Sequence, residues 1–141
     1  MTYTGRCGCG AVTLFIAGEP VATRQCWCRQ CQQIACGGPT NNAMFGSGSV
    51  AITGELSWNS YVAASGNTLS HGFCARCGSQ MVACSSARPH LRTLRLGALD
   101  EPHGLRPQIA IWTQEAPDWA VIDPALERFA RQPPPPPAPR D

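Results

Sequence analysis

The sequence predicts a mainly β protein, and three observations support this prediction. Its 141 residues are enough for one domain with a modest hydrophobic core. Several short apolar runs are separated by turn residues, which is typical of a domain of short antiparallel strands. A single short segment near the C-terminus has the pattern of a helix.

The expected elements follow one another closely along the chain. The first strand is expected at residues 11–16, where Val12, Leu14 and Ile16 fall on one face. Further strands and a hairpin turn are expected at 50–53, 60–63, 65–67 (the turn), 68–73, 81–84, 93–98 and 109–112. The cysteine-rich segment 24–38 is expected to be a loop organised by a metal. A short helix should begin after Asp123, which could cap it.

Charge and hydropathy exclude several classes of protein. The net charge is +2, and the arginines are scattered, so no basic block indicates a nucleic-acid or membrane surface. No segment reaches the roughly 18 apolar residues of a membrane helix, and the first residues lack the apolar stretch of a signal peptide. We therefore expect a cytoplasmic protein, in which nine reduced cysteines indicate metal binding rather than disulfides.

Two pairs of cysteines predict a structural zinc site. Cys74 and Cys77 are separated by two residues and followed by Gly78, as in a zinc knuckle. A knuckle supplies half of a tetrahedral site, and the natural partner is the isolated pair Cys7 and Cys9. Four thiolates would close this site and link the N-terminus to the middle of the chain.

A second cluster has a different composition. Cys26, Cys28 and Cys31 lie within six residues, and three thiolates with an open fourth position are typical of a catalytic zinc. The alternative is that Cys36 supplies a fourth ligand and closes the site. Cys84 is expected to be a core thiol. His71 is expected to be a strand residue, with a role as a base or distal ligand as the alternative.

These motifs resemble one known family. Cys-x-Cys-Gly at 7–10, Cys-x-Cys-x-x-Cys at 26–31 and Phe-Cys-x-x-Cys-Gly at 73–78 occur in that order. With Ile111-Trp112 and the Pro-Asp-Trp at 117–119, they resemble the glutathione-dependent formaldehyde-activating (GFA or CENP-V domain) family over residues 5–129. Two positions depart from its commoner pattern, since Ala110 stands where many relatives have histidine and the loop at 36–38 differs.

The resemblance implies a β-tent fold, two zinc ions and hemithioacetal chemistry. It assigns Cys7, Cys9, Cys74 and Cys77 to structural zinc. It assigns Cys26, Cys28 and Cys31 as catalytic residues that bind a second zinc, at which the substrate thiolate would act. Residues 1–131 would form the GFA-like domain, and 132–141 a disordered proline-rich tail.

The leading functional hypothesis is a zinc-dependent carbon–sulfur lyase-like enzyme. Its partners would be a thiol such as glutathione and a small aldehyde, whose adduct in the family's named enzyme is S-hydroxymethylglutathione. Arg29 and Arg76 are candidates for binding substrate carboxylates. The alternatives are a non-enzymatic zinc module that binds proteins and a thiol-based redox or metal-handling protein. A homodimer is left open, because a strand such as 50–53 could form a sheet edge.

Overall fold

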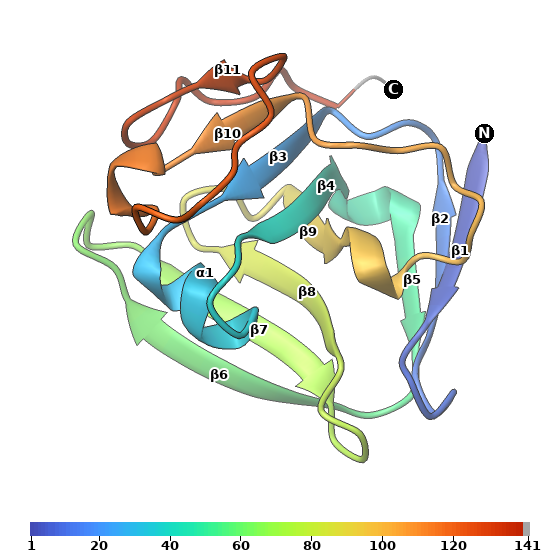
Figure 1. Ribbon diagram of the computed structural model, residues 1–141. Helices are drawn as coiled ribbons and strands as arrows, with labels where there is room; N and C mark the ends of the chain where they lie inside the picture. Colours follow the sequence, from blue (N-terminus) through green and yellow to red (C-terminus); the bar gives the residue numbers. More distant parts are fainter. Residues whose placement is uncertain (140–141) are drawn as a thin grey trace.

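The computed structural model describes residues 1–139, and strands are its main regular elements (Figure 1). The strands are β1 (Thr2–Arg6), β2 (Thr13–Ala17), β3 (Ala22–Cys26), β4 (Thr40–Gly46), β5 (Val50–Thr53), β6 (Leu56–Val62), β7 (Thr68–Cys74), β8 (Gln80–Ser85), β9 (Leu91–Arg95), β10 (Ile109–Ile111) and β11 (Glu127–Arg128). The helical segments are α1 (Arg29–Ile34) and the 3₁₀ turns η1 (Ser47–Ser49), η2 (Leu96–Ala98) and η3 (Thr113–Glu115). The prediction of a mainly β protein is confirmed.

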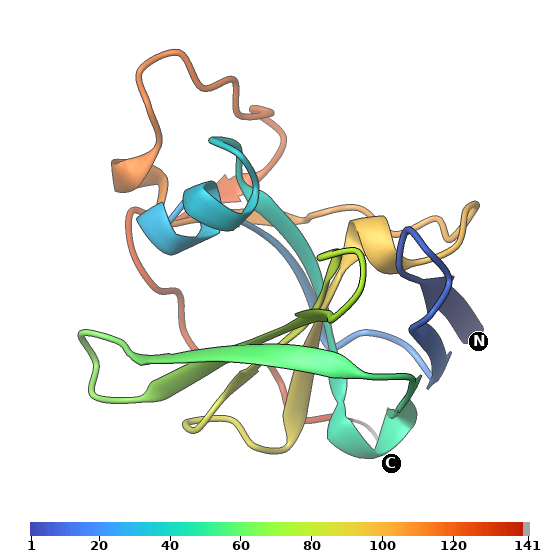
Figure 2. The same cartoon turned by 90° about the horizontal axis from the view of Figure 1, so that it is seen from below.

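The strands form two sheets. One has three strands in the order β1-β2-β5, so β5 is an edge strand. The other has eight strands in the order β11-β10-β3-β4-β9-β8-β7-β6. Its pairs are antiparallel, except that β10 runs parallel to both β3 and β11. Figure 2 shows this sheet strongly bent, with β6 and β7 on one arm and β3, β10 and α1 on the other.

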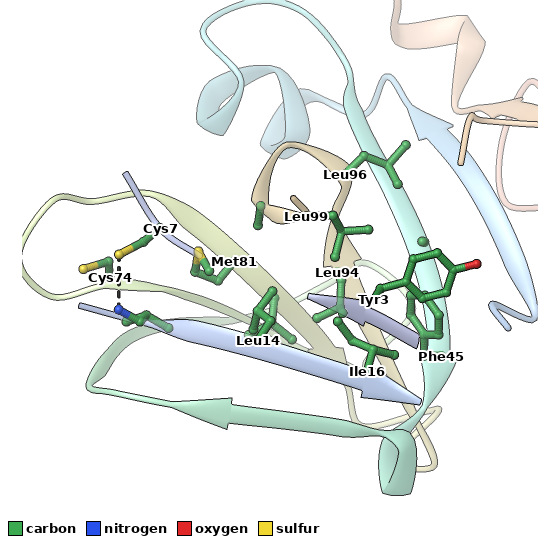
Figure 3. Close-up of a cluster of buried hydrophobic side chains, with 14 residues drawn as sticks. Tyr3, Cys7, Leu14, Ile16, Phe45, Cys74, Met81, Leu94, Leu96 and Leu99 are labelled. Carbon is green, nitrogen blue, oxygen red and sulfur yellow. Dashed lines mark hydrogen bonds between the residues drawn. The ribbon is translucent and has the colours of Figure 1, made fainter. Parts of the chain in front are cut away.

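The hydrophobic core lies between the small sheet and one face of the large sheet (Figure 3). Alternate residues of β2 point inward, and the predicted face of Val12, Leu14 and Ile16 is fully buried. These side chains join Phe45 of β4 and Leu94 of β9, both of which have no exposed surface. The core therefore fixes β4 and β9 from one side and leaves their other face for the site described below.

Two expectations from the sequence are wrong. No helix forms after Asp123; that residue caps a single turn, and the chain then pairs as β11 with β10. Hydrogen bonding to the sheet edge satisfies the backbone better than an isolated short helix could. The segment 24–38 is not simply a loop, because it contains the end of β3 and all of α1.

The proline-rich segment contacts the rest of the protein where it is described. Pro133 is buried. Pro139 lies close to Gly46, where an added Cβ would meet the proline ring at 3.2 Å. The last two residues of the expected tail, 140 and 141, lie outside the described residues. Within 1–139, no helix is long and apolar enough to cross a membrane.

Candidate functional site

The first group of cysteines brings together two distant parts of the chain. Cys7 and Cys9 come from the loop that follows β1, while Cys74 and Cys77 come from the end of β7 and the following turn. All four Sγ atoms lie within 4.8 Å of one another, with 3.6 Å between Cys7 and Cys9 and 3.8 Å between Cys9 and Cys74. A tetrahedron of sulfurs around zinc has edges of about 3.8 Å, so this group is shaped to hold a metal ion.

Backbone N–H groups stabilise negative charge on these sulfurs. The amide of Val12 donates to Cys7 Sγ at 3.3 Å (Figure 3). The amide of Arg76 donates to Cys74 Sγ at 3.4 Å. Gly10 and Gly78 each follow a cysteine pair and have φ values of 79° and 76°. This left-handed conformation is inexpensive only for glycine, and it lets each loop fold back around its two sulfurs.

The second group of cysteines lies where β3 meets α1. Cys26 ends β3, Cys28 caps the helix and accepts the Cys31 amide at 3.4 Å, and Cys31 occupies the first turn. Their three Sγ atoms lie within 4.8 Å of one another. Cys36 is exposed and does not belong to this group. Within residues 1–139, no fourth histidine, cysteine or carboxylate completes it.

A chain of buried hydrogen bonds supports the second group from the large sheet. Thr40 Oγ1 donates to Cys31 Sγ at 3.1 Å. Asn42 Nδ2 donates to Thr40 Oγ1 at 2.9 Å, and Arg95 Nη1 donates to Asn42 Oδ1 at 2.6 Å. Arg95 thus orients Asn42, and Asn42 orients Thr40. This series of hydrogen bonds places a donor next to the sulfur of Cys31 and a positive charge behind it.

The chemistry of the three thiols fits a soft divalent cation. Hydrogen bonds from Cys26 and then Cys28 lower the pKa of Cys31 to about 3, whereas hydrogen bonds to Cys28 and then Cys31 raise the pKa of Cys26. The thiols therefore share protons instead of ionising together. A cation would remove this conflict by balancing three thiolate charges at once. Thiolate ligands select zinc and other soft metals.

The second group borders a cavity of about 160 Å³ on the face of the large sheet that points away from the core. Tyr61 and His71 line one wall, with their rings edge to face and 5.5 Å between centroids. Burial lowers the pKa of His71, and the charge of Arg95 lowers it further, so its imidazole is neutral at pH 7. Trp112 and Gln132 line the cavity as well, and the indole Nε1 donates to Gln132 Oε1 at 3.2 Å.

The structure brings together the seven cysteines in the two groups expected from the sequence. His71 is a strand residue, as expected, and its side chain also faces the cavity. Cys84 packs against the core, as expected, and lines the cavity too. The two arginines proposed for substrate binding do not line the cavity, and Arg29 donates to Gln32 instead.

Sequence reasoning missed the polar residues that surround the second group. The cavity lining includes Arg24, Asn42, Arg88 and Arg95. Of these, only Arg24 carries a local signal, because it precedes Cys26 by two residues and so shares its face of a strand. The others come from strands and a loop that approach only in the folded protein.

Comparisons with known proteins identify the family. The family model described as glutathione-dependent formaldehyde-activating enzyme matches residues 2–115, which include both groups of cysteines. A search of curated proteins finds no match. A solved structure of a Rhodobacter sphaeroides protein is similar in fold, with 20% identity, a TM-score of 0.57, and coverage of 74% of this chain and 97% of that chain. Since the family model matches most of the length of this chain, the chain belongs to the glutathione-dependent formaldehyde-activating enzyme family.

Proposed function

We propose that the protein is a zinc-dependent carbon–sulfur lyase-like enzyme that acts on the hemithioacetal of a thiol and a small aldehyde, of the S-hydroxymethylglutathione type. One observation supports this most strongly. Three clustered thiols border a cavity, and within residues 1–139 no fourth protein ligand closes the group. Three protein ligands and one open position are the usual composition of a catalytic zinc site. Family membership supports the thiol and the aldehyde as substrates.

The proposed reaction forms or breaks one carbon–sulfur bond. In the forward direction the thiol sulfur adds to the carbonyl carbon, and the thiol proton ends on the new hydroxyl oxygen. The reverse reaction returns this proton and expels the thiol. Zinc bound by Cys26, Cys28 and Cys31 would supply Lewis acidity and lower the pKa of a substrate thiol at the open position.

The protein's own side chains would position the reactants. The hydrogen-bond chain from Arg95 through Asn42 and Thr40 holds Cys31 in place and balances part of the thiolate charge. His71 is a neutral imidazole in the cavity wall and could take up the thiol proton. Zinc at the first group would be structural, since four thiolates leave no open position. All nine cysteines are free, which suits a reducing cytoplasm.

Zinc stoichiometry and thiol binding test this proposal. We expect two zinc ions per reduced chain, one in Cys31→Ala, and glutathione binding by calorimetry only where the second zinc is present. Cys36→Ala is the matched control, because Cys36 is exposed and lies outside both groups. It should keep both zinc ions and bind glutathione like the wild type.

Turnover completes the test. Zinc-loaded protein should accelerate the exchange between free formaldehyde, glutathione and their adduct. Loss of the second zinc in Cys36→Ala would mean that the site is closed. Two zinc ions with neither thiol binding nor turnover would refute the enzymatic proposal and favour a zinc-stabilised binding module.

A further inference from the structure

Arg24 is a buried positive charge with no hydrogen-bond or ion-pair partner among the residues that the structure describes. Its side chain is only 5% exposed, and its Nε is shielded from solvent and has no hydrogen-bond acceptor. No ion pair or hydrogen bond to its guanidinium is found within residues 1–139. A buried charge without an acceptor costs several kcal/mol, and native proteins normally compensate such a group. Within residues 1–139, this side chain therefore has no carboxylate partner.

The position of Arg24 connects it to the cavity. Arg24 pairs with Asn42 of β4, which pairs with Arg95 of β9, so the three residues form one row across the sheet. All three line the cavity. Asn42 Oδ1 already accepts a hydrogen bond from Arg95, and so Arg24 is left without an acceptor in its own row.

A second guanidinium faces the same space. Arg88, from the loop between β8 and β9, also lines the cavity. Arg95 contributes a third positive charge, and its Nε also has no acceptor. Among the described residues that line the cavity there is no aspartate or glutamate. Two guanidinium groups that line one cavity, with no carboxylate among the described lining residues, can form a site for an anion.

We propose that Arg24 and Arg88 form a carboxylate subsite in this cavity, next to the three-thiol group. The proposal rests on the proposed function and specifies its substrate class: one of the two reactants carries a carboxylate close to the reacting carbon or sulfur. Arg24 and Cys26 lie on the same strand face two residues apart, which corresponds to about 7 Å. A carboxylate bound by Arg24 would therefore lie in the same cavity as the open position beside Cys26.

The volume of the cavity suits a compact substrate, or the reacting end of a larger thiol such as glutathione. Its volume of about 160 Å³ is below the roughly 300 Å³ at which pockets enclose drug-sized ligands. A short mercaptocarboxylate, or a small aldehyde that carries a carboxylate, matches this space. The carboxylate could belong to the thiol or to the aldehyde. Arg24 would bind it in the same way in both cases, so the experiment uses different probes to distinguish the two.

The test compares charged and neutral thiols on the zinc-loaded protein. Calorimetry with 3-mercaptopropionate and 3-mercaptopropan-1-ol should give a roughly ten- to hundredfold preference for the acid. Arg24→Gln should abolish this preference and leave binding of the alcohol unchanged. Arg92→Gln is the matched control, since Arg92 lies on β9 but not in the cavity lining and donates to backbone carbonyls. It should keep the wild-type preference.

Further probes separate this proposal from the proposed function. Propionate, which has no thiol, should raise the unfolding temperature of the wild type but not of Arg24→Gln. If propionate does so while neither thiol binds, the subsite stands and the thiol chemistry fails. If both thiols bind equally and Arg24→Gln changes neither, the subsite is refuted and the thiol chemistry stands. The last probe is glyoxylate, an aldehyde that carries a carboxylate, tested with a neutral thiol present. If glyoxylate binds more tightly than propionate to the wild type but not to Arg24→Gln, the aldehyde is the reactant that carries the carboxylate.

Folding of the variant is controlled independently. Arg24→Gln removes an uncompensated buried charge, so without anion it should unfold at a higher temperature than the wild type. If it does not fold, Arg88→Gln provides the same comparison from a half-buried position. An unchanged acid preference in a folded Arg88→Gln would overturn the paired-arginine site.

Discussion

Thr40→Val tests whether the large sheet supports the second group of cysteines. The Thr40 hydroxyl donates to Cys31 Sγ at 3.1 Å and accepts from Asn42 Nδ2 at 2.9 Å, and the threonine is 6% exposed. Valine has nearly the same shape but removes both hydrogen bonds. We expect the affinity of the second site for zinc to fall, because the thiolate loses its donor.

Two independent arguments give a similar size for this loss. A hydrogen bond to a charged group contributes about 1.5–3 kcal/mol, and removal of a residue that supports a metal ligand lowers metal affinity about 10–100-fold. Since each factor of ten is about 1.4 kcal/mol, the second figure corresponds to about 1.4–2.8 kcal/mol. The Asn42 amide is left without this acceptor, which should also reduce the free energy of unfolding by about 1–3 kcal/mol.

Competition with a chromophoric chelator measures the affinity, and the zinc ion lost in Cys31→Ala identifies the second site. Thr93→Val is the matched control, since Thr93 also lines the cavity but takes no part in the hydrogen-bond chain. Thr40→Ser should restore most of the affinity because it keeps the hydroxyl. A Thr40→Val protein that holds its second zinc within about threefold of the wild type would refute the reasoning.

Three further predictions concern stability. Cys77→Ser should lose one zinc ion and become much less stable, because structural zinc supplies on the order of 10 kcal/mol of folding free energy. Thermal melting combined with zinc analysis measures both effects. A melting temperature like that of the control Cys36→Ser would contradict this prediction. Gly54→Ala should destabilise by at least about 2 kcal/mol, because φ is 105° and the new Cβ would overlap the Ala11 carbonyl. Gly37→Ala, at φ 102° with no neighbour within 4 Å, is its control, and equal losses in urea titrations would exclude the overlap. Because the folded-state pKa of His71 is below its unfolded value of 6.5, the free energy of unfolding should fall as pH drops from about 6.5 towards the folded pKa; His71→Gln should show a shallower fall, and identical pH profiles would contradict the assignment.

The two groups of cysteines could be predicted because metal binding has a strong local signature. Two residues between Cys74 and Cys77, and three thiols from Cys26 to Cys31, are patterns that packing alone rarely produces in a reduced protein. Pairing of the knuckle with Cys7 and Cys9 followed because that pair also stood alone, and the structure brings the same four sulfurs together. The position of Cys36 could not be decided in this way, because a glycine-rich loop allows either arrangement.

Strands β1, β3 and β4 were not predicted, and for β3 and β4 the reason is chemical. β3 carries Thr23, Arg24 and Gln25, and β4 begins with Thr40 and two asparagines, so neither shows the alternation of apolar residues that identifies a strand. Their polar side chains line the cavity, as Arg24 and Asn42 do, or hydrogen-bond to each other across the sheet, as Gln25 does to Asn41. Pattern-based reasoning therefore fails at the strands that build the site.

The expected C-terminal helix failed for a different reason. Asp123 does accept a capping hydrogen bond, from the Ala125 amide, so the local signal is genuine. The chain then makes only one turn, because Phe129 donates to Ala110 and residues 127–128 pair with β10. A helix of two turns is marginal alone, and tertiary pairing with a sheet edge outweighs it.

Strand β4 explains why the second group can be both polar and rigid. Ala43 and Phe45 point into the core and have no exposed surface, while Asn42 between β3 and β9 faces the cavity. Each side of the strand thus fixes the other: packing on one face holds the amide that orders Thr40 and Cys31 on the opposite face. Since the supporting hydrogen bonds come from strands anchored in the core, a metal at the cysteines would be held in a preorganised position. Trp112 and Gln132 lie outside the strands and line the same cavity, so they could be varied without changing the hydrogen bonds that support Cys31.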